Sequence, residues 1–418
     1  MINKIKDHKK KIKKIFRYAL DQNSSIQIVH NRVVNMYSNQ TDIHVVAIGK
    51  SAPFMLDGAI KALGSKFSDA LLITKIQCGS EKFLSNSNIE TIIAGHPIPD
   101  ENSLLAGEKL VLYVKKLQKQ DSILFLISGG TSSLVEYIPD RVKPLISITD
   151  IAKVNKWLLA NDKNIIDVNT IRKKISGIKA GRLLNYIKCD TIHSLYISDV
   201  PNDCVTHIGS GLLIPEDKKN KFNELPHWIE KLIKLAESIA TADIKNKKII
   251  SDIVFSNSVL RQSIINVAKN TGYSETHNMD EFVSGNTIRE AHRIGRWLKK
   301  QEKGLYVWGA ETHMVLPDHP GMGGRNQSFA LALAKELQNS SNVIVLLAGT
   351  DGNDGNTTDA GAIIDGKTIE RGERKGVSFE SCLNEANAGV FLSASGDLLS
   401  LGTTGTNVMD IIMALIWD

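Results

Sequence analysis

The chain has 418 residues and a mass of 46.0 kDa, a length typical of about two to four domains. Hydrophobic residues make up 42% and charged residues 23%, an ordinary globular mixture that excludes the disordered and fibrous classes. The formal net charge of +6 equals the excess within the first 14 residues, which hold seven lysines and one aspartate. The rest of the chain is therefore near neutral, which argues against a nucleic-acid-binding body.

The four cysteines, Cys78, Cys189, Cys204 and Cys382, are far apart, and no pair has metal-ligand or redox spacing. This usage fits a reducing compartment. No apolar run approaches the roughly 18 residues that span a bilayer, and the basic N-terminus lacks the apolar core of a secretory signal. We therefore expect a cytoplasmic protein with no membrane partner.

The first expected element is a helix over residues 2–21. Its apolar residues recur near helical spacing, with lysines between them; they are Ile5, Ile12, Ile15, Phe16 and Leu20. An amphipathic helix packed on the body explains this pattern better than a membrane or RNA anchor does.

Short apolar runs follow from residue 42, and each ends in glycine, serine or a polar residue before a helical stretch. They lie at 44–48, 71–73, 91–94, 122–127 and 194–197. Continuously apolar strands that alternate with helices indicate a parallel sheet covered on both faces. In such sheets the loops after the strand ends form the binding crevice.

A second region begins near residue 247, with expected strands at 249–255, 305–308, 343–348, 362–364 and 398–402. We expect helices over 328–337 and, from the apolar run at the end of the chain, over 408–417. The chain thus divides into two α/β domains, 1–245 and 246–418, with the boundary near residue 245.

Two of the expected strand-end loops are suited to an anion. Gly49, Lys50 and Ser51 lie between a strand and a helix, where backbone N–H groups and the helix dipole favour negative charge. The two-glycine frame of a P-loop is absent, and a lysine that begins a surface helix is common.

The loop after residue 127 has a stronger signal. It combines two glycines with hydroxyls at a helix start; the candidate phosphate-binding residues are Ser128, Gly129, Gly130, Thr131 and Ser132. A tight turn with a serine N-cap would explain the same residues, but the strongly apolar preceding strand favours phosphate binding.

Acidic residues follow other strands. Asp199 and Asp203 share one loop and suit Mg²⁺ or a proton acceptor, although they suit an ordinary turn equally well. Glu311 and Thr312 form another strand-end pair, and Asp351 lies in an acidic glycine loop whose spacing differs from that of an EF-hand.

Arg325 and Asn326 follow three glycines at a helix start. A guanidinium in this position can bind a carboxylate or a phosphoryl group through two hydrogen bonds. A glycine hinge with an arginine that caps a neighbouring helix would give the same pattern. The first strand is not followed by a dinucleotide fingerprint, and no nucleophile elbow is present. Cations, glycine loops and acids together favour phosphoryl transfer.

The ordered set of motifs resembles the glycerate 2-kinase family, the class II glycerate kinases with a MOFRL domain. The matching segments are 46–52, 95–100, 127–130, 168–173, 198–201, 311–312, 323–327, 349–352 and 402–408. The resemblance implies ATP-dependent, Mg²⁺-dependent phosphorylation of the C2 hydroxyl of D-glycerate to 2-phosphoglycerate, by a monomer or homodimer. It also implies a Rossmann-like parallel-sheet N-terminal domain, a smaller α/β C-terminal domain with the MOFRL region at about 303–412, and a cleft between them.

Lys50 and Arg325 match the family's catalytic lysine and arginine, which face that cleft. We expect Lys50 to neutralise the transferring group, the loop from Ser128 to Ser132 to hold phosphate oxygens with Gly49 and Ser51, and Arg325 to bind the phosphoryl group or the substrate carboxylate. Asp199 is expected to be catalytic or a Mg²⁺ ligand, with Asp203 as a second possible ligand. The expected substrate-binding residues are Glu311, Thr312, Asn326 and Asp351.

The chain departs from the family's usual pattern at Thr131, where a third glycine is common, and at residues 386–389. These departures bear on the substrate more than on the reaction. The alternatives are a hydroxypyruvate reductase using NAD(P)H, which would need the missing fingerprint, and a sugar-acid or nucleotide sensor without turnover.

Overall fold

The computed structural model describes residues 2–37, 42–76, 80–160, 165–215, 225–239, 241 and 247–418. The chain forms two compact units: the N-terminal unit, Ser25–Phe255, and the C-terminal unit, which combines Met1–Ser24 with Ser256–Asp418. This division differs from the expected 1–245 and 246–418, because the first 24 residues join the C-terminal unit and the strand before residue 256 joins the N-terminal unit. The expected boundary at 245 itself lies outside the described residues.

The N-terminal unit is built on a parallel six-stranded sheet in the order β3-β2-β1-β4-β5-β6, which confirms the predicted fold class. The strands are β1 Ile43–Ile48, β2 Phe67–Thr74, β3 Ile89–Ile93, β4 Ser122–Ile127, β5 Thr191–Ile197 and β6 Lys248–Phe255. The central strands are apolar on both faces because helices cover both sides of the sheet.

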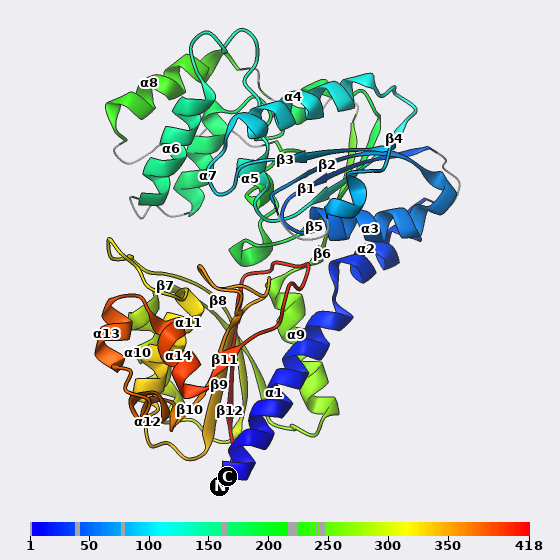
Figure 1. Cartoon of the computed structure of the whole chain (residues 1–418). Helices are drawn as coiled ribbons and strands as arrows, with labels where there is room; N and C mark the ends of the chain where they lie inside the picture. Colours follow the sequence, from blue (N-terminus) through cyan, green and yellow to red (C-terminus); the bar gives the residue numbers. More distant parts are fainter. Residues whose placement is uncertain are drawn as a thin grey trace. The chain divides into compact units, whose positions relative to one another are not determined.

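Two helices, α2 (Ser25–Val33) and α3 (Ala52–Leu63), cover one face of this sheet, and α4 (Glu101–Lys116) covers the other (Figure 1). The short α5 (Thr131–Leu134) follows β4. A further group of helices, with an apolar cluster of its own, comprises α6 Ile148–Ala160, α7 Ile165–Ile175 and α8 His227–Leu235. Single 3-10 turns lie at Gly64–Lys66, Glu81–Phe83, Arg182–Tyr186, Pro201–Asp203, Ile208–Ser210 and Ala236–Ser238.

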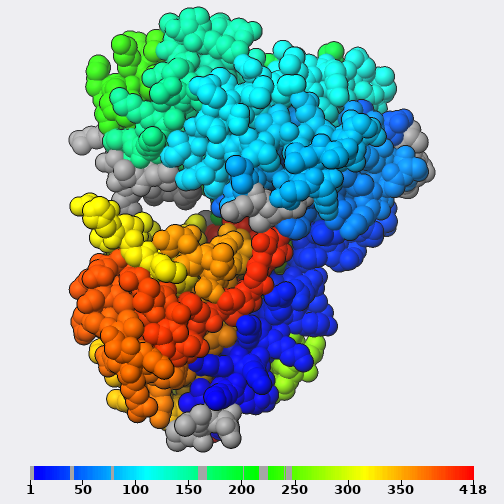
Figure 2. Space-filling view, in the orientation of Figure 1, coloured from blue at the N-terminus to red at the C-terminus, as the bar shows by residue number. Residues whose placement is uncertain are grey.

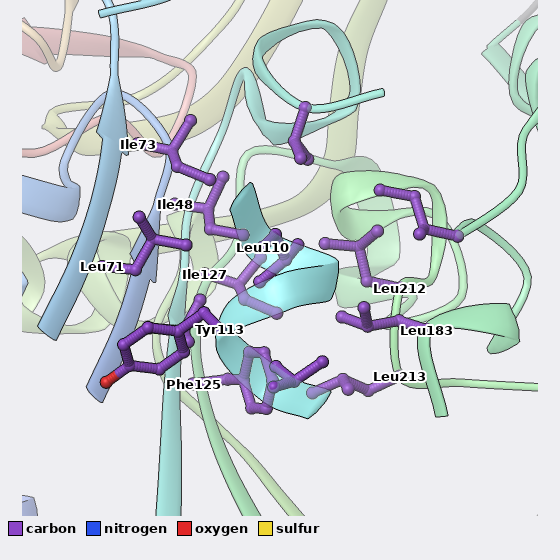
Figure 3. Packing of buried hydrophobic residues seen from close by; sticks show 14 of the residues in the cluster. Ile48, Leu71, Ile73, Leu110, Tyr113, Phe125, Ile127, Leu183, Leu212 and Leu213 are labelled. Carbon is purple, nitrogen blue, oxygen red and sulfur yellow. The ribbon is translucent and has the colours of Figure 1, made fainter. Parts of the chain in front are cut away.

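The core of the N-terminal unit lies between the sheet and α4. Figure 3 shows Ile48, Ile73 and Phe125 from three neighbouring strands facing Leu110 and Tyr113 of α4. The three strand side chains are fully buried, and each buried side chain of this size contributes about 1.5 to 3 kcal/mol. This packing holds the strand ends, and therefore the loops that follow them, in fixed register.

The C-terminal unit contains a mixed six-stranded sheet in the order β11-β10-β9-β12-β8-β7. The strands are β7 Thr276–Asn286, β8 Gly304–His313, β9 Val343–Gly349, β10 Gly361–Asp365, β11 Leu398–Leu399 and β12 Asp410–Ile416. On one face lie α1 Ile2–Gln22 and α9 Asn257–Asn270; the other helices are α10 Thr287–Leu298, α11 Arg325–Glu336, α12 Thr368–Glu373, α13 Phe379–Asn384 and α14 Ala388–Ser395 (Figure 1).

The prediction of a helix over residues 408–417 is wrong. Residues 410–416 form β12, which lies inside the sheet and pairs antiparallel with both β8 and β9. Every residue of this strand is buried, so the run carries no polar face that would distinguish a strand from a buried helix by its periodicity. The expected strand at 398–402 is reduced to two residues, and the helix expected to begin at 328 begins at Arg325.

The predicted N-terminal helix is confirmed as α1, and its five predicted apolar residues are all buried. Figure 2 shows α1 in blue along the surface of the C-terminal unit. Lys9 Nζ lies 2.6 Å from both Asp365 Oδ2 and Asp397 Oδ1, two nearly buried carboxylates that Arg371 also contacts. This network explains why α1 belongs to the C-terminal unit. Within the described residues, no helix is long and apolar enough to cross a membrane.

Candidate functional site

The strand order of the N-terminal unit reverses between β1 and β4. From this point β2 and β3 extend in one direction and β5 and β6 in the other. Parallel sheets bind ligands outside the carboxyl ends of the strands at such a switch point. The loops that follow β1, β4 and β5 carry the predicted residues 49–51, 128–132 and 199.

Backbone hydrogen bonds join the first two loops. The N–H of Lys50 donates to the Gly129 carbonyl at 2.8 Å, and the N–H of Ser51 donates to Ser128 Oγ at 3.1 Å. These bonds fix the backbone of Lys50, while its side chain is half-buried. Within the described residues the Lys50 ammonium has no hydrogen-bond or ion-pair partner. The lysine is therefore a positioned cation that remains available to a ligand.

The glycines of these loops are required by close contacts within the protein. A Cβ on Gly49, whose φ is +128°, would lie 2.2 Å from Ser128 Oγ. A Cβ on Gly129 would lie 2.0 Å from Asp199 Oδ2. The absence of side chains thus lets three loops meet and places the carboxylate of Asp199 against the β4 loop.

Most predicted phosphate-binding hydroxyls are occupied inside the protein. Thr131 Oγ1 lies 2.9 and 2.7 Å from the carbonyl oxygens of Ile48 and Ser128, which share its one proton, and Ser132 Oγ lies 2.6 Å from Ser210 Oγ. Thr131 thus connects the loop to the end of β1. A threonine at this position, where the family commonly has glycine, therefore has a structural role.

The backbone of the same loop is free to bind an anion. In the part of the chain that the structure describes, the N–H groups of Gly129, Gly130, Thr131 and Ser132 donate no hydrogen bond. Gly130 has φ +87° and turns the chain into α5. Consecutive free N–H groups of this kind bind phosphate oxygens. The predicted function of the loop therefore rests on its backbone more than on its hydroxyls.

Asp199 lies beside Lys50 and keeps partial exposure. Burial raises the pKa of Asp199 above its ordinary value, and the positive charge of Lys50 opposes that rise. Asp203 ends the 3-10 turn Pro201–Asp203 and is partly exposed. Among the described residues no group of three or more His, Cys, Asp or Glu side chains could hold a metal ion. Mg²⁺ often needs only one or two carboxylates together with substrate phosphates, and Asp199 fits that limited role.

His96 is part of the same loop cluster, although the sequence did not mark it as a site residue. Its Nδ1 lies 2.7 Å from Ser133 Oγ. Burial, together with the charges of Lys50, Lys75 and Arg172, lowers the pKa of His96 to about 3. The signal in the sequence was its position just after an apolar run, where the other expected loops also lie.

In the C-terminal unit, Arg325 begins α11 and forms ion pairs with two acids. Its Nε lies 2.6 Å from Asp410 Oδ2, and its Nη1 lies 3.8 Å from Glu311 Oε1. Burial alone would lower the pKa of Arg325, but the charge and hydrogen bond of Asp410, together with the charges of Glu311 and Asp354, outweigh it and raise the pKa. Asp410 is the first residue of β12, so sequence reasoning missed it because this segment was expected to be helical.

The other predicted residues of this unit mainly support its structure. Asp354 accepts hydrogen bonds from the backbone N–H groups of Asn326 and Gln327 at 3.1 and 2.8 Å, and from Asn326 Nδ2 at 3.3 Å. The Thr312 hydroxyl is bonded to Thr287 at 3.0 Å and is buried. Asp351 accepts from a backbone N–H two residues later, as in a turn.

The fold and its switch-point loops define a doubly wound α/β protein with a candidate anion-binding site formed by backbone N–H groups and a lysine. A family model described as a domain of unknown function, DUF4147, matches residues 11–241, and the MOFRL family model matches residues 304–410. D-glycerate 2-kinase of Thermotoga maritima is 31% identical over 90% of this chain and 91% of its own length. Glycerate 2-kinase of Pyrococcus horikoshii is 31% identical over 90% of this chain and 87% of its own.

A relative from Agrobacterium vitis, 31% identical over 89% of this chain and 98% of its own length, is named provisionally as a hydroxypyruvate reductase. Among solved structures, the glycerate kinase of Thermotoga maritima superposes with a TM-score of 0.83 at 27% identity, over 98% of this chain and all of that one. The chain belongs to the glycerate 2-kinase family, which confirms the predicted resemblance.

Proposed function

We propose that the protein transfers the γ-phosphoryl group of ATP to the C2 hydroxyl of D-glycerate and releases 2-phosphoglycerate and ADP. The observation that carries this proposal is that, among the described residues, neither the Lys50 ammonium nor the four backbone N–H groups of residues 129–132 have a hydrogen-bond partner, in adjoining loops at the switch point. Family membership and the names of the relatives support the choice of substrates. The alternative of a reductase has less support, because the dinucleotide fingerprint is missing after β1.

The N–H groups of residues 129–132 hold phosphate oxygens in this proposal, with Gly49 and Ser51 keeping the neighbouring turn in place. Lys50 neutralises charge on the transferring group, which is the main task in phosphoryl transfer. Arg325 binds the phosphoryl group or the carboxylate of the acid, and Asp410 and Glu311 orient its guanidinium. Both cations are needed for turnover.

Asp199 is the proposed ligand of Mg²⁺, with Asp203 as a second carboxylate on the same loop. Held by these carboxylates, Mg²⁺ would supply positive charge that offsets the charge developing during transfer. Burial disfavours the charged form of Asp199, and a cation bound beside it would favour the carboxylate, as the charge of Lys50 already does.

In the C-terminal unit, Glu311 and Asp351 are the proposed contacts of the acid's hydroxyl groups. Thr312 and Asn326 were expected to bind substrate directly, but their side chains form hydrogen bonds within the protein, to Thr287 and Asp354. We infer that they hold the surrounding loops in position.

We also propose that the enzyme works in the cytoplasm, where ATP is available. Cys189, Cys204 and Cys382 are free thiols within the described residues, in keeping with a reducing compartment; Cys78 lies outside them.

The test is turnover of D-glycerate with Mg-ATP, measured as ADP release. Lys50→Ala should lower kcat by about a hundredfold or more, whereas Lys61→Ala should leave it unchanged. Lys61 is a matched control because it lies on α3, near the same loop in sequence, and its ammonium pairs with Asp57 at the surface. Absence of ADP release with glycerate, together with oxidation of NAD(P)H by hydroxypyruvate without ATP, would reject the kinase in favour of the reductase.

A further inference from the structure

The imidazole of His96 and the side chain of Lys50 flank the same glycine. A Cβ built on Gly130 would lie 3.2 Å from Lys50 Cγ and 3.3 Å from both Cε1 and Nδ1 of His96. His96 Nδ1 also lies 2.7 Å from Ser133 Oγ, in the first turn of α5. The imidazole is thus held beside the proposed phosphoryl-transfer loop by its hydrogen bond to Ser133 and lies close to Gly130.

Burial and neighbouring positive charges favour the neutral form of His96. The ring is mostly buried, and the cations that act on it come from three elements: Lys50 after β1, Lys75 after β2 and Arg172 on α7. Burial first, and then these charges, hold the pKa of His96 at about 3. Protonation would add a fourth positive charge to a partly desolvated cluster, which is unfavourable.

The contacts of Ser133 favour one tautomer of His96. The Ser133 hydroxyl lies in donor geometry 3.1 Å from the Gly130 carbonyl. A hydroxyl has one proton, and we assign it to this bond, so that Ser133 Oγ accepts from the N–H at Nδ1 of His96. Nε2 is then unprotonated and presents a lone pair, an arrangement that the surrounding positive charges favour. Among the described residues Nε2 has no hydrogen-bond partner.

We propose that His96 Nε2 accepts the hydrogen bond of the substrate hydroxyl that becomes phosphorylated and so aims its oxygen for in-line attack. This rests on the proposed kinase function. As the hydroxyl oxygen bonds to the γ-phosphorus, the bond to the β–γ bridging oxygen breaks and ADP leaves with the electron pair. The hydroxyl proton, shared with Nε2 during transfer, then passes to solvent.

A neutral acceptor suits this position better than a carboxylate. Asp199 already lies beside Lys50, and a second carboxylate would further offset the charge of the ammonium that the transferring group needs. The imidazole orients a hydroxyl and leaves the charge of Lys50 available. Since phosphoryl transfer depends mainly on positioning, a hydrogen bond of this kind is worth roughly a tenfold to hundredfold change in rate.

The kinetic test compares His96→Ala with His96→Gln, whose amide oxygen reaches the place of Nε2. We expect His96→Ala to lower kcat/KM for D-glycerate by roughly ten- to a hundredfold, with KM for ATP changed less than about threefold. His96→Gln should recover a large part of the loss. His30→Gln, on α2 outside the loop cluster, serves as the control.

Long-range ¹H–¹⁵N NMR of the imidazole, assigned by comparison with His96→Gln, tests the tautomer without turnover. A proton on Nδ1 supports the proposal, and a proton on Nε2 overturns it. A wild-type protein that phosphorylates glycerate while His96→Ala retains its full kcat/KM would also overturn it. If the wild-type protein does not phosphorylate glycerate at all, the proposed function fails instead.

Discussion

Replacing Arg325 separates its proposed catalytic role from its structural one. The guanidinium lies 2.6 Å from Asp410, whose side chain is only 5% exposed. Arg325→Ala leaves that carboxylate buried without its partner, whereas Arg325→Lys keeps a positive charge close to it. The two variants should therefore differ in stability and agree in activity.

The structure sets the expected size of each effect. Loss of one partner of a buried ion pair costs about 3 to 5 kcal/mol; because Arg325 is 36% exposed and water can reach the site, we expect Arg325→Ala to lower the free energy of unfolding by about 3 kcal/mol. Arg325→Lys loses one charge-assisted hydrogen bond at most and should cost about 1 kcal/mol. Arg325→Ala and Arg325→Lys should each lower kcat by about a hundredfold, because an ammonium cannot replace the bidentate hydrogen bonding of a guanidinium.

Urea unfolding and ADP release would be measured on the same preparations. Arg374→Ala is the matched control, because Arg374 is an exposed arginine of the same unit that pairs with exposed Glu370. Near-normal kcat in Arg325→Lys would refute the catalytic role. An unchanged free energy of unfolding in Arg325→Ala would refute the account of its ion pair with Asp410.

Three further predictions concern stability, loop geometry and pH. Lys9→Met should lower the free energy of unfolding of the C-terminal unit by about 2 to 3 kcal/mol in urea, because it leaves two buried carboxylates to one arginine, whereas exposed Lys10→Met should have no effect. Gly129→Ala should lower kcat at least tenfold with the fold retained by circular dichroism, since its Cβ would lie 2.0 Å from Asp199 Oδ2; full activity would contradict the close approach. Burial raises the pKa of Asp354 to about 6, above the ordinary 3.8, so its contribution to stability is complete below pH 4 and is lost as pH rises through 6. The unfolding free energy of wild type minus that of Asp354→Asn should fall by about 2 to 3 kcal/mol over this range, and a flat difference would refute the shift.

The sequence was sufficient for the N-terminal sheet because its signal is local. Apolar runs that end in glycine or serine mark buried parallel strands, and parallel strands bring their carboxyl ends to one edge. The proximity of Lys50, Gly129 and Asp199 therefore follows from chain order and strand order. Chain order does not show which groups of the loop bind a ligand and which hold the loop in place. The hydrogen bond from Thr131 to the Ile48 carbonyl at the end of β1 could be recognised only once the register of the strands was known.

The C-terminal unit shows where sequence reasoning fails. The run at 410–416 is apolar at nearly every position, and its assignment as a strand depends on two antiparallel neighbours far away in the chain. Once that strand was taken for a helix, Asp410 could not be recognised as the partner of Arg325. The placement of α1 with this unit likewise depends on Lys9 and on carboxylates more than 350 residues later.

The central claim is that the protein phosphorylates the C2 hydroxyl of D-glycerate. The most direct measurement is identification of the product formed from D-glycerate and Mg-ATP by ³¹P NMR, checked with enolase, which converts 2-phosphoglycerate to phosphoenolpyruvate. We predict 2-phosphoglycerate in equal amount to ADP, formed about a hundredfold or more slowly by Lys50→Ala. Formation of 3-phosphoglycerate, or release of ADP without any phosphorylated acid, would contradict it.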